Sequence, residues 1–144
     1  MSGFTIQEYV RWGDVDAAGV ICYGAYVRFI EIAETELFRA AGIPYGKVFE
    51  RFDCWLPRAS YKMEFRKPAV LDERLSVNAS VGRIGTSSIA LAFTFDDGRG
   101  ERIADCDIVL VCVDRKNFRP KPVPDAMRAA LAPFADPSGA RSAS

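Results

Sequence analysis

Apolar and polar residues alternate along four separate stretches of the chain, a pattern typical of β-strands with one buried face. These stretches are residues 4–11, 59–65, 75–81 and 87–95. A fifth stretch, 102–114, contains a continuous apolar run from 108 to 113, which predicts a strand buried on both faces. The segment Asp97-Gly98-Arg99-Gly100 precedes it and predicts a hairpin turn. We therefore expect an antiparallel sheet of about five strands.

Between residues 23 and 41 the alternation gives way to a helical period. Apolar side chains recur there at steps of three and four residues, at Tyr26, Phe29, Ile30, Ala33, Leu37 and Ala41. The charged residues of the stretch fall elsewhere on the helix, at Arg28, Glu31, Glu34 and Arg39. Gly42 and Pro44 supply the expected stop at its C-terminus. The pattern predicts one long amphipathic helix, roughly 30 Å in length, that lies across the sheet.

The chain of 144 residues is long enough for one domain with a real core and leaves little room for a second. Its composition, 49% hydrophobic and 26% charged, is that of an ordinary globular domain. A long helix after the first strand, followed by successive strands, predicts an α+β fold in a single domain at 1–134. A short helix is expected at 125–131, and the polar residues 135–144 are expected to form a flexible tail.

Charge and residue usage narrow the possible functions. Nineteen basic residues balance nineteen acidic ones, so we expect neither nucleic acid nor a membrane as a partner. We find no signal peptide or membrane span in the sequence, and a cytoplasmic location follows as an expectation. The four cysteines form no C-x-x-C pair and histidine is absent, so no metal and no cofactor are expected. Because histidine is also the usual base of serine and cysteine hydrolases, any hydrolytic chemistry must start from a carboxylate.

Two carboxylates, Asp14 and Asp16, stand just ahead of the predicted long helix in a turn that contains glycine. The first turn of a helix offers free backbone N–H groups and a partial positive charge, which together stabilise an oxyanion. A carboxylate and an oxyanion hole would then face one carbonyl group. Turn and helix-capping roles explain the same two residues equally well.

The same segment carries a resemblance to a known family. It reads GDVDAAGVI from Gly13 to Ile21 and is followed by Tyr23 and Tyr26 at the start of the helix. This arrangement resembles the signature of the 4-hydroxybenzoyl-CoA thioesterase family of hotdog-fold proteins. The resemblance covers most of the chain, from about Thr5 to Val113. It implies a hotdog fold and an enzyme that hydrolyses an acyl-CoA thioester to the free acid and CoA.

The resemblance also implies roles for individual residues. The family's catalytic aspartate falls on Asp16, as nucleophile or as general base towards the thioester carbonyl. Its oxyanion donor falls on the backbone N–H of Tyr23, with possible help from Gly24. Asp14 would then be structural.

Substrate class and assembly follow from the resemblance in a similar way. Related thioesterases that act on acyl-carrier proteins or short acyl chains tend to carry histidine at the Tyr23 position, whereas the aryl-CoA enzyme carries tyrosine. An aryl acyl group, such as a hydroxybenzoyl group, is therefore favoured. The alternatives are a thioesterase for acyl-carrier proteins or short aliphatic acyl-CoA, and a non-catalytic module that binds acyl groups. The family forms dimers that assemble into tetramers, so we expect a homo-oligomer with each site built between two chains.

The expected contacts to substrate depart from the family at one point. The aryl-CoA enzyme has a basic cluster after the third strand, where this chain has Gly85-Thr86-Ser87. The remaining candidates for the CoA phosphates are Arg58, Lys62, Arg66, Lys67 and Arg83, although such residues often lie on a solvated face. Tyr45 and Trp55 are candidates for an acyl pocket, because they lie in the irregular stretch between helix and sheet. Pro57, Ser87 and Ser88, at or beside matching positions, complete the predicted binding set.

Overall fold

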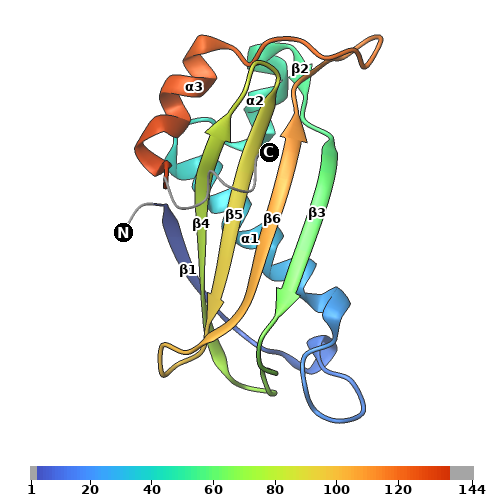
Figure 1. Ribbon diagram of the computed structural model, residues 1–144, viewed down its shortest axis with the longest axis vertical. Coiled ribbons are helices and arrows are strands. Elements are labelled where there is room, and N and C mark those ends of the chain that lie inside the picture. The colour runs from blue at the N-terminus through green and yellow to red at the C-terminus, as the bar shows by residue number, and fades with distance from the viewer. Residues whose placement is uncertain (1–2, 137–144) are drawn as a thin grey trace.

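A five-stranded antiparallel sheet carries one long helix, α1, along one of its faces (Figure 1). The computed structural model describes residues 3–136. The strands of the sheet follow the order β1-β4-β5-β6-β3, so that β1 and β3 form its two edges. Their bounds are Phe4–Tyr9 for β1, Arg58–Phe65 for β3, Arg74–Ile84 for β4, Ser88–Asp96 for β5 and Arg102–Val111 for β6. The predicted α+β architecture with about five strands is confirmed.

The last predicted strand, 102–114, is in fact divided. β6 ends at Val111, and the short strand β7, Val113–Asp114, pairs instead with β2, Cys54–Trp55, in a separate two-stranded sheet. The chain leaves the large sheet at Cys112, whose N–H donates to the carbonyl of Ser87 at 2.7 Å. Burial on both faces was also wrong for part of the run. The side chains at 109 and 111 are only partly buried, because α1 covers the opposite face of the sheet.

Helix α1 spans Tyr26–Ala40 and is preceded by a 3₁₀ turn, Tyr23–Ala25. The predicted long helix is therefore present, with its first turn more tightly wound than the rest. Its end is closed as expected, because Gly42 takes a φ of +81° and the N–H of Ile43 donates to the carbonyl of Phe38 at 3.0 Å. Five of the six predicted apolar positions are fully buried: Tyr26, Phe29, Ile30, Ala33 and Leu37.

The core lies between α1 and the face of the sheet that the helix covers. At the centre of this layer Phe95 of β5 packs edge-on against Tyr26, with 5.1 Å between ring centroids, and lies 6.5 Å from Phe29. Alternate residues of β4, β5 and β6 point into the same layer, as the period of a strand requires. The packing of α1 on this face fixes where its N-terminal turn lies relative to the sheet.

Glu34, one of the charged residues of the predicted helix, is buried. Only 3% of this residue is exposed, because Arg58 and Tyr45 fold over its carboxylate. Tyr45 begins a second helix, α2, Tyr45–Phe52, in the stretch that was expected to be irregular. The buried charge is therefore paired, as buried charges generally are.

The C-terminal helix α3, Asp125–Leu131, has the predicted bounds and is followed by a 3₁₀ turn, Ala132–Phe134. Beyond it the N–H of Asp136 donates to the carbonyl of Val81 at 2.8 Å. The predicted flexible tail falls mostly on 137–144, outside the described residues. None of the helices within residues 3–136 combines the length and the apolar character needed to span a membrane.

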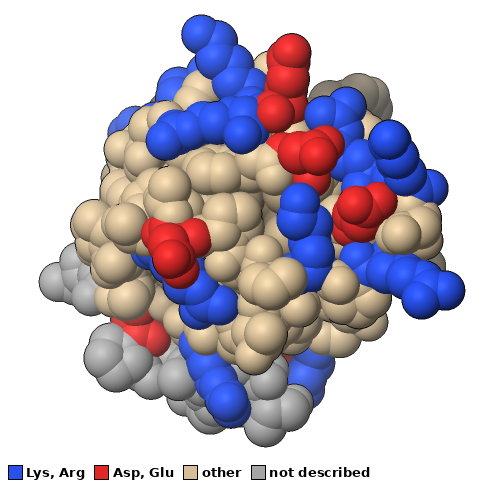
Figure 2. Space-filling model, turned by 90° about the horizontal axis from the view of Figure 1, so that it is seen from above, with Lys and Arg blue, Asp and Glu red and all other residues tan. Residues whose placement is uncertain are grey.

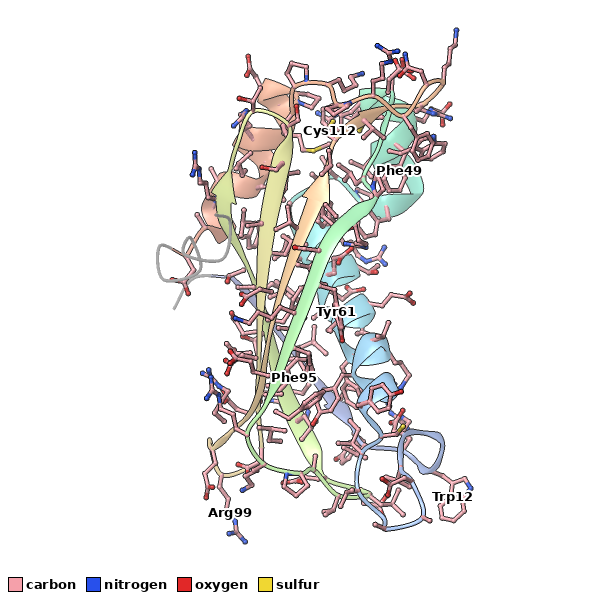
Figure 3. All side chains as sticks on the ribbon, turned by 45° about the vertical axis from the view of Figure 1, so that its right-hand side comes forward. Trp12, Phe49, Tyr61, Phe95, Arg99 and Cys112 are labelled. Carbon is pink, nitrogen blue, oxygen red and sulfur yellow. The ribbon has the colours of Figure 1, made fainter. Side chains whose placement is uncertain are left out.

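Side-chain positions mark the two ends of the molecule (Figure 3). Trp12, in the loop before α1, lies at one end, and Phe49 of α2 and Cys112 lie at the other. Tyr61 lies between them on the edge strand β3.

Candidate active site

The loop between β1 and α1 is folded into a narrow hairpin that ends at Asp16. Val15 and Ile21 form an antiparallel bridge, and the N–H of Cys22 donates to the carbonyl of Asp14 at 2.7 Å. At the tip, the N–H of Gly19 donates to the carbonyl of Asp16 at 2.9 Å. Gly19 has a φ of +78°, a conformation that favours glycine. The backbone thus presents the Asp16 side chain from a defined turn.

The Asp16 carboxylate is exposed and has one local partner. Its Oδ1 accepts the N–H of Ala18 at 2.8 Å, which is the hydrogen bond of an Asx turn. Residues 3–136 supply no other hydrogen bond to this carboxylate, so its second oxygen faces solvent. The turn role considered from the sequence is therefore present, and it leaves an oxygen available for chemistry.

The backbone N–H groups of Tyr23 and Gly24 open the 3₁₀ turn before α1. The N–H of Ala25 closes that turn on the carbonyl of Cys22 at 2.9 Å, whereas neither of the two preceding N–H groups donates to any described residue. Tyr23 borders a cleft of about 360 Å³ between the start of α1 and the end of β3, and Gly24 is the next residue along the chain. The lining residues of the cleft are Ile21, Tyr23, Tyr26, Phe65, Arg66, Lys67 and Pro68. Free N–H donors thus lie beside an aromatic cleft, as an oxyanion hole requires.

Within one chain, Asp16 and the N–H of Tyr23 border different hollows. Asp16 lies in a shallow one that it shares with Trp12, Val15, Ala17, Gly19 and Leu71. The cleft beside Tyr23 does not include Asp16. Both hollows are open, and large apolar side chains are exposed around them, with Trp12 at 80% and Tyr23 at 78%.

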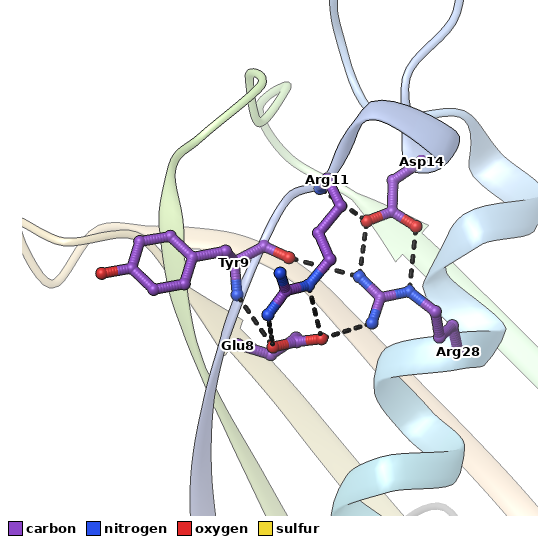
Figure 4. A network of polar contacts seen from close by, with 5 residues as sticks. All are labelled: Glu8, Tyr9, Arg11, Asp14 and Arg28. Carbon is purple, nitrogen blue, oxygen red and sulfur yellow. Dashed lines mark hydrogen bonds and ion pairs between the residues drawn. The ribbon is translucent and has the colours of Figure 1, made fainter.

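Asp14 has surroundings opposite to those of Asp16 (Figure 4). It is buried, and its carboxylate accepts the N–H of Arg11 at 2.8 Å and two hydrogen bonds from the Arg28 guanidinium at 2.5 and 3.0 Å. Burial alone would raise the pKa of Asp14, but the hydrogen bonds from Arg28 and Arg11 outweigh it and lower the pKa. This residue holds the loop together.

Two predicted binding residues, Arg58 and Tyr45, belong to an ion-pair cluster around Glu34. Arg58 is bidentate to this carboxylate at 2.6 and 2.8 Å, and the Tyr45 hydroxyl donates to it as well. Burial, followed by the negative charge of Glu34, strongly raises the pKa of Tyr45. Glu34 and Arg58 border a second cavity, of about 300 Å³, with Val27, Ile30, Glu31, Tyr61 and Ile108.

The other predicted pocket residues gather at the α2 end of the molecule. Trp55 packs between Phe49, with 5.4 Å between ring centroids, and the guanidinium of Arg115 at 4.5 Å. Pro57 and Ser87 use their carbonyls to accept the N–H groups of Val111 and Cys112, and the carbonyl of Ser88 accepts the N–H of Gly85. The structure does not bring this group together with Asp16 in one chain. The two sets are separated by α1, whose 15 residues span about 22 Å.

Most of the candidate cations for the CoA phosphates already have acidic partners. Arg66 pairs with Asp105 at 2.5 Å, and Lys67 binds Asp97 and Glu101. Lys62 and Arg83 are exposed and make no ion pair with any residue from 3 to 136. The sequence reasoning overlooked a basic run at 115–121, which holds four cations and no acid. Figure 2 views this end of the molecule and shows Lys and Arg side chains around its rim.

Comparisons with known proteins identify the fold and the family of the chain. The model of the thioesterase-like superfamily matches residues 10–131. A 1,4-dihydroxy-2-naphthoyl-CoA hydrolase of Thermosynechococcus vestitus is 27% identical over 87% of this chain and 86% of its own length. The structure of a 1,4-dihydroxy-2-naphthoyl-CoA thioesterase from Synechocystis superposes with a TM-score of 0.82 at 19% identity, over 90% of this chain and 95% of that one.

A variant of 4-hydroxybenzoyl-CoA thioesterase in complex with 4-hydroxybenzoyl-CoA also superposes with a TM-score of 0.82 at 19% identity, over 91% and 99% of the two chains. These likenesses confirm the predicted hotdog fold. Because the superfamily model covers most of the sequence, the resemblance to thioesterases is confirmed as well, and the chain is a thioester hydrolase that belongs to the thioesterase-like superfamily.

Proposed function

We propose that this enzyme is an acyl-CoA thioesterase that prefers aryl acyl groups and uses Asp16 as its catalytic carboxylate. The observation that carries the proposal is that one loop holds an exposed carboxylate and the two N–H groups of Tyr23 and Gly24, which donate to no described residue, with Tyr23 beside an aromatic cleft. Relatives named for hydrolysis of 1,4-dihydroxy-2-naphthoyl-CoA support the aryl preference. We expect the enzyme to act in the cytoplasm.

In the proposed mechanism, the thioester oxygen accepts hydrogen bonds from the N–H groups of Tyr23 and Gly24. These donors stabilise the negative charge that develops on the oxygen as the carbonyl carbon becomes tetrahedral. Asp16 either takes a proton from the attacking water or attacks the carbonyl carbon itself. When Asp16 acts as the base, loss of the CoA thiolate, which takes up a proton, leaves the free acid directly. When Asp16 is the nucleophile, loss of the thiolate leaves an anhydride between Asp16 and the acyl group, and a water molecule hydrolyses this anhydride to the free acid and restores Asp16.

A second copy of the chain completes the site in this proposal. Among residues 3–136 no strand pairs with the outer edge of β3, and Tyr61 and Phe65 on this strand are 49% and 54% exposed. Val27 of α1, 51% exposed, lines the same cavity as Tyr61, between helix and strand. Exposed apolar residues next to an open strand edge favour pairing with a second chain.

Antiparallel pairing of two β3 strands about a two-fold axis would set the Phe65 end of one chain against the Arg58 end of the other. The loop with Asp16 would then meet the Glu34 cluster and the basic α2 end of the partner subunit. Such a dimer brings together the predicted pocket residues that a single chain keeps apart. We propose that two dimers form a homotetramer.

A thioesterase for acyl-carrier proteins is the second candidate. The basic run at 115–121 favours it, because a carrier protein would dock through acidic residues. The same acyl group presented on CoA and on a carrier protein separates the two. We expect a higher kcat/KM with CoA, and the opposite order would favour the second candidate.

The substrate class is tested with a panel of CoA thioesters at fixed enzyme concentration. We expect kcat/KM for benzoyl-CoA, 4-hydroxybenzoyl-CoA or 1,4-dihydroxy-2-naphthoyl-CoA to exceed that for palmitoyl-CoA by at least about 10-fold, since pocket shape discriminates on this scale. Equal or faster hydrolysis of palmitoyl-CoA would refute the aryl preference. Butyryl-CoA belongs in the same panel, because it would be the best substrate of a short-chain enzyme but not of an aryl-CoA or a long-chain enzyme.

A further inference from the structure

Arg28, in the first turn of α1, contacts three residues from two other segments of the chain (Figure 4). Its Nε and Nη2 bind the two oxygens of Asp14 at 3.0 and 2.5 Å, and its Nη1 donates to Glu8. Nη2 also donates to the carbonyl of Tyr9 at 3.2 Å. One planar guanidinium therefore joins α1, β1 and the loop between them.

Asp14 is linked both to Asp16 and to the turn that carries the N–H groups of Tyr23 and Gly24. Its carbonyl accepts the N–H of Cys22, the residue immediately before Tyr23. Along the chain Asp14 stands only two residues before Asp16, with the bridge residue Val15 between them. The position of one side chain thus sets both strands of the hairpin whose tip carries Asp16 and whose end carries the oxyanion donors.

We propose that Arg28 is a positioning residue for thioester hydrolysis, acting through Asp14 to hold the Asp16 carboxylate in register with the N–H groups of Tyr23 and Gly24. The inference rests on the proposed function. Arg28 lines neither the cleft beside Tyr23 nor the hollow that contains Asp16, so its effect on the substrate is indirect.

The contacts of Arg28 with Asp14 and Glu8, here called the Arg28 clamp, are more rigid than a surface ion pair because they are partly buried. The side chains of Asp14 and Glu8 are only 7% and 16% exposed, and that of Arg28 is 36% exposed. A guanidinium fork fixes the direction of both oxygens of a carboxylate, which a lysine ammonium does not. Reaction rates are sensitive to such registration, because a displacement of about 1 Å can cost about 100-fold in rate.

The test compares Arg28→Gln and Arg28→Lys in the full-length protein, in the wild-type and the Asp16→Asn backgrounds. The substrate is the best thioester of the CoA panel, under steady-state and single-turnover conditions, with melting curves for every variant. In the wild-type background we expect Arg28→Gln to lower kcat by about 10- to 100-fold with KM changed by less than about 3-fold. The kcat of Arg28→Lys should lie between those of wild type and Arg28→Gln, because lysine keeps the positive charge but cannot form the two-pronged contact of a guanidinium.

In the Asp16→Asn background, Arg28→Gln should lower the residual rate by less than about 2-fold, because the group that Arg28 positions is no longer active. Arg39→Gln, which removes another arginine of α1 that pairs with Glu36 on the surface, is the matched control and should keep the wild-type kcat. If Arg28→Gln does not fold, Arg28→Lys carries the same comparison.

Two results overturn the inference alone: a wild-type kcat in a folded Arg28 variant, or an equal fractional loss in both backgrounds, which would indicate a merely structural role. Failure of the underlying function gives a different result. Full activity of Asp16→Asn would overturn the catalytic assignment and the inference together.

Discussion

Asp14 and Asp16 are two residues apart and have contrasting environments. Asp14 is buried and bound by Arg28, whereas Asp16 is exposed and keeps one oxygen free. The sequence alone offers the two carboxylates as equals, and only the resemblance to thioesterases distinguishes them. The structure supplies a physical difference between an acid that stabilises a loop and an acid that is available to a substrate.

The Arg28 clamp should make the protein less stable as the pH falls into the acid range. Hydrogen bonds from Arg11, opposed by partial burial and aided by Arg28, lower the pKa of Glu8 from 4.5 to about 2. Because the folded-state pKa is depressed, this stabilisation is fully present above about pH 4.5 and is lost as the pH falls towards 2. The shifted pKa of Asp14 acts in the same direction.

We therefore expect the wild-type melting temperature to fall steeply from pH 5 to pH 3. Glu8→Gln should melt at a lower temperature than wild type at pH 7 and show a flatter dependence in that window. Glu36→Gln, at an exposed pair on α1, should keep the wild-type slope. Identical slopes for Glu8→Gln and wild type would show that the Glu8 contacts do not stabilise the fold.

At the scale of elements, the sequence predicts those strands and helices whose apolar residues recur at a regular spacing. The strands and α1 follow from steps of two residues and of three to four residues. Helix α2 has the same signal, with Tyr45, Val48, Phe49 and Phe52 at helical spacing, but Gly46 and its short length conceal it. The ion pairs Arg28–Asp14 and Glu34–Arg58 follow no regular spacing in the sequence, because they depend on how α1 lies on the sheet.

The packing of α1 on the sheet can be tested at Phe95, which contacts Tyr26 and Phe29 from β5. Phe95→Ala should lower the free energy of unfolding in urea by about 3–5 kcal/mol, since it leaves a cavity in a fully buried layer. Thr94→Ala, at the next residue on the opposite face, should change it by less than about 1 kcal/mol. Equal losses would contradict the assignment of this face as the core.

At the scale of the whole molecule, the Asp16 loop and the residues predicted to line the acyl pocket lie at opposite ends. The Asp16 loop lies at the start of α1, and Tyr45 and Trp55 lie beyond its end. Sequence reasoning placed these residues around one pocket, because it had no information on distances within the fold. The proposed dimer through β3 would bring the two together.

We expect the protein to have a mass in solution of at least twice 15.9 kDa by light scattering. Phe65→Asp, which places a charge on the open edge strand, should favour the monomer and lower activity with it. Gln7→Asp is the control, because it places a charge at an exposed position on β1, the opposite edge of the sheet, and should leave the dimer and its activity intact. A fully active monomeric wild type would refute the shared site.

The most direct test of the account as a whole is single-turnover hydrolysis by Asp16→Asn. Asparagine keeps the size of the side chain and an acceptor oxygen for the N–H of Ala18, so the turn should survive. It neither attacks a carbonyl carbon nor takes a proton from water at neutral pH. Asp14→Asn is the control, and it should lower the melting temperature more than it lowers the rate of the folded fraction.

The account predicts that well-folded Asp16→Asn binds the thioester and hydrolyses it about 10²- to 10⁴-fold more slowly than wild type. A folded Asp16→Asn protein that keeps more than about a tenth of the wild-type rate, a barrier change of less than about 1.4 kcal/mol, would remove Asp16 from the catalytic role.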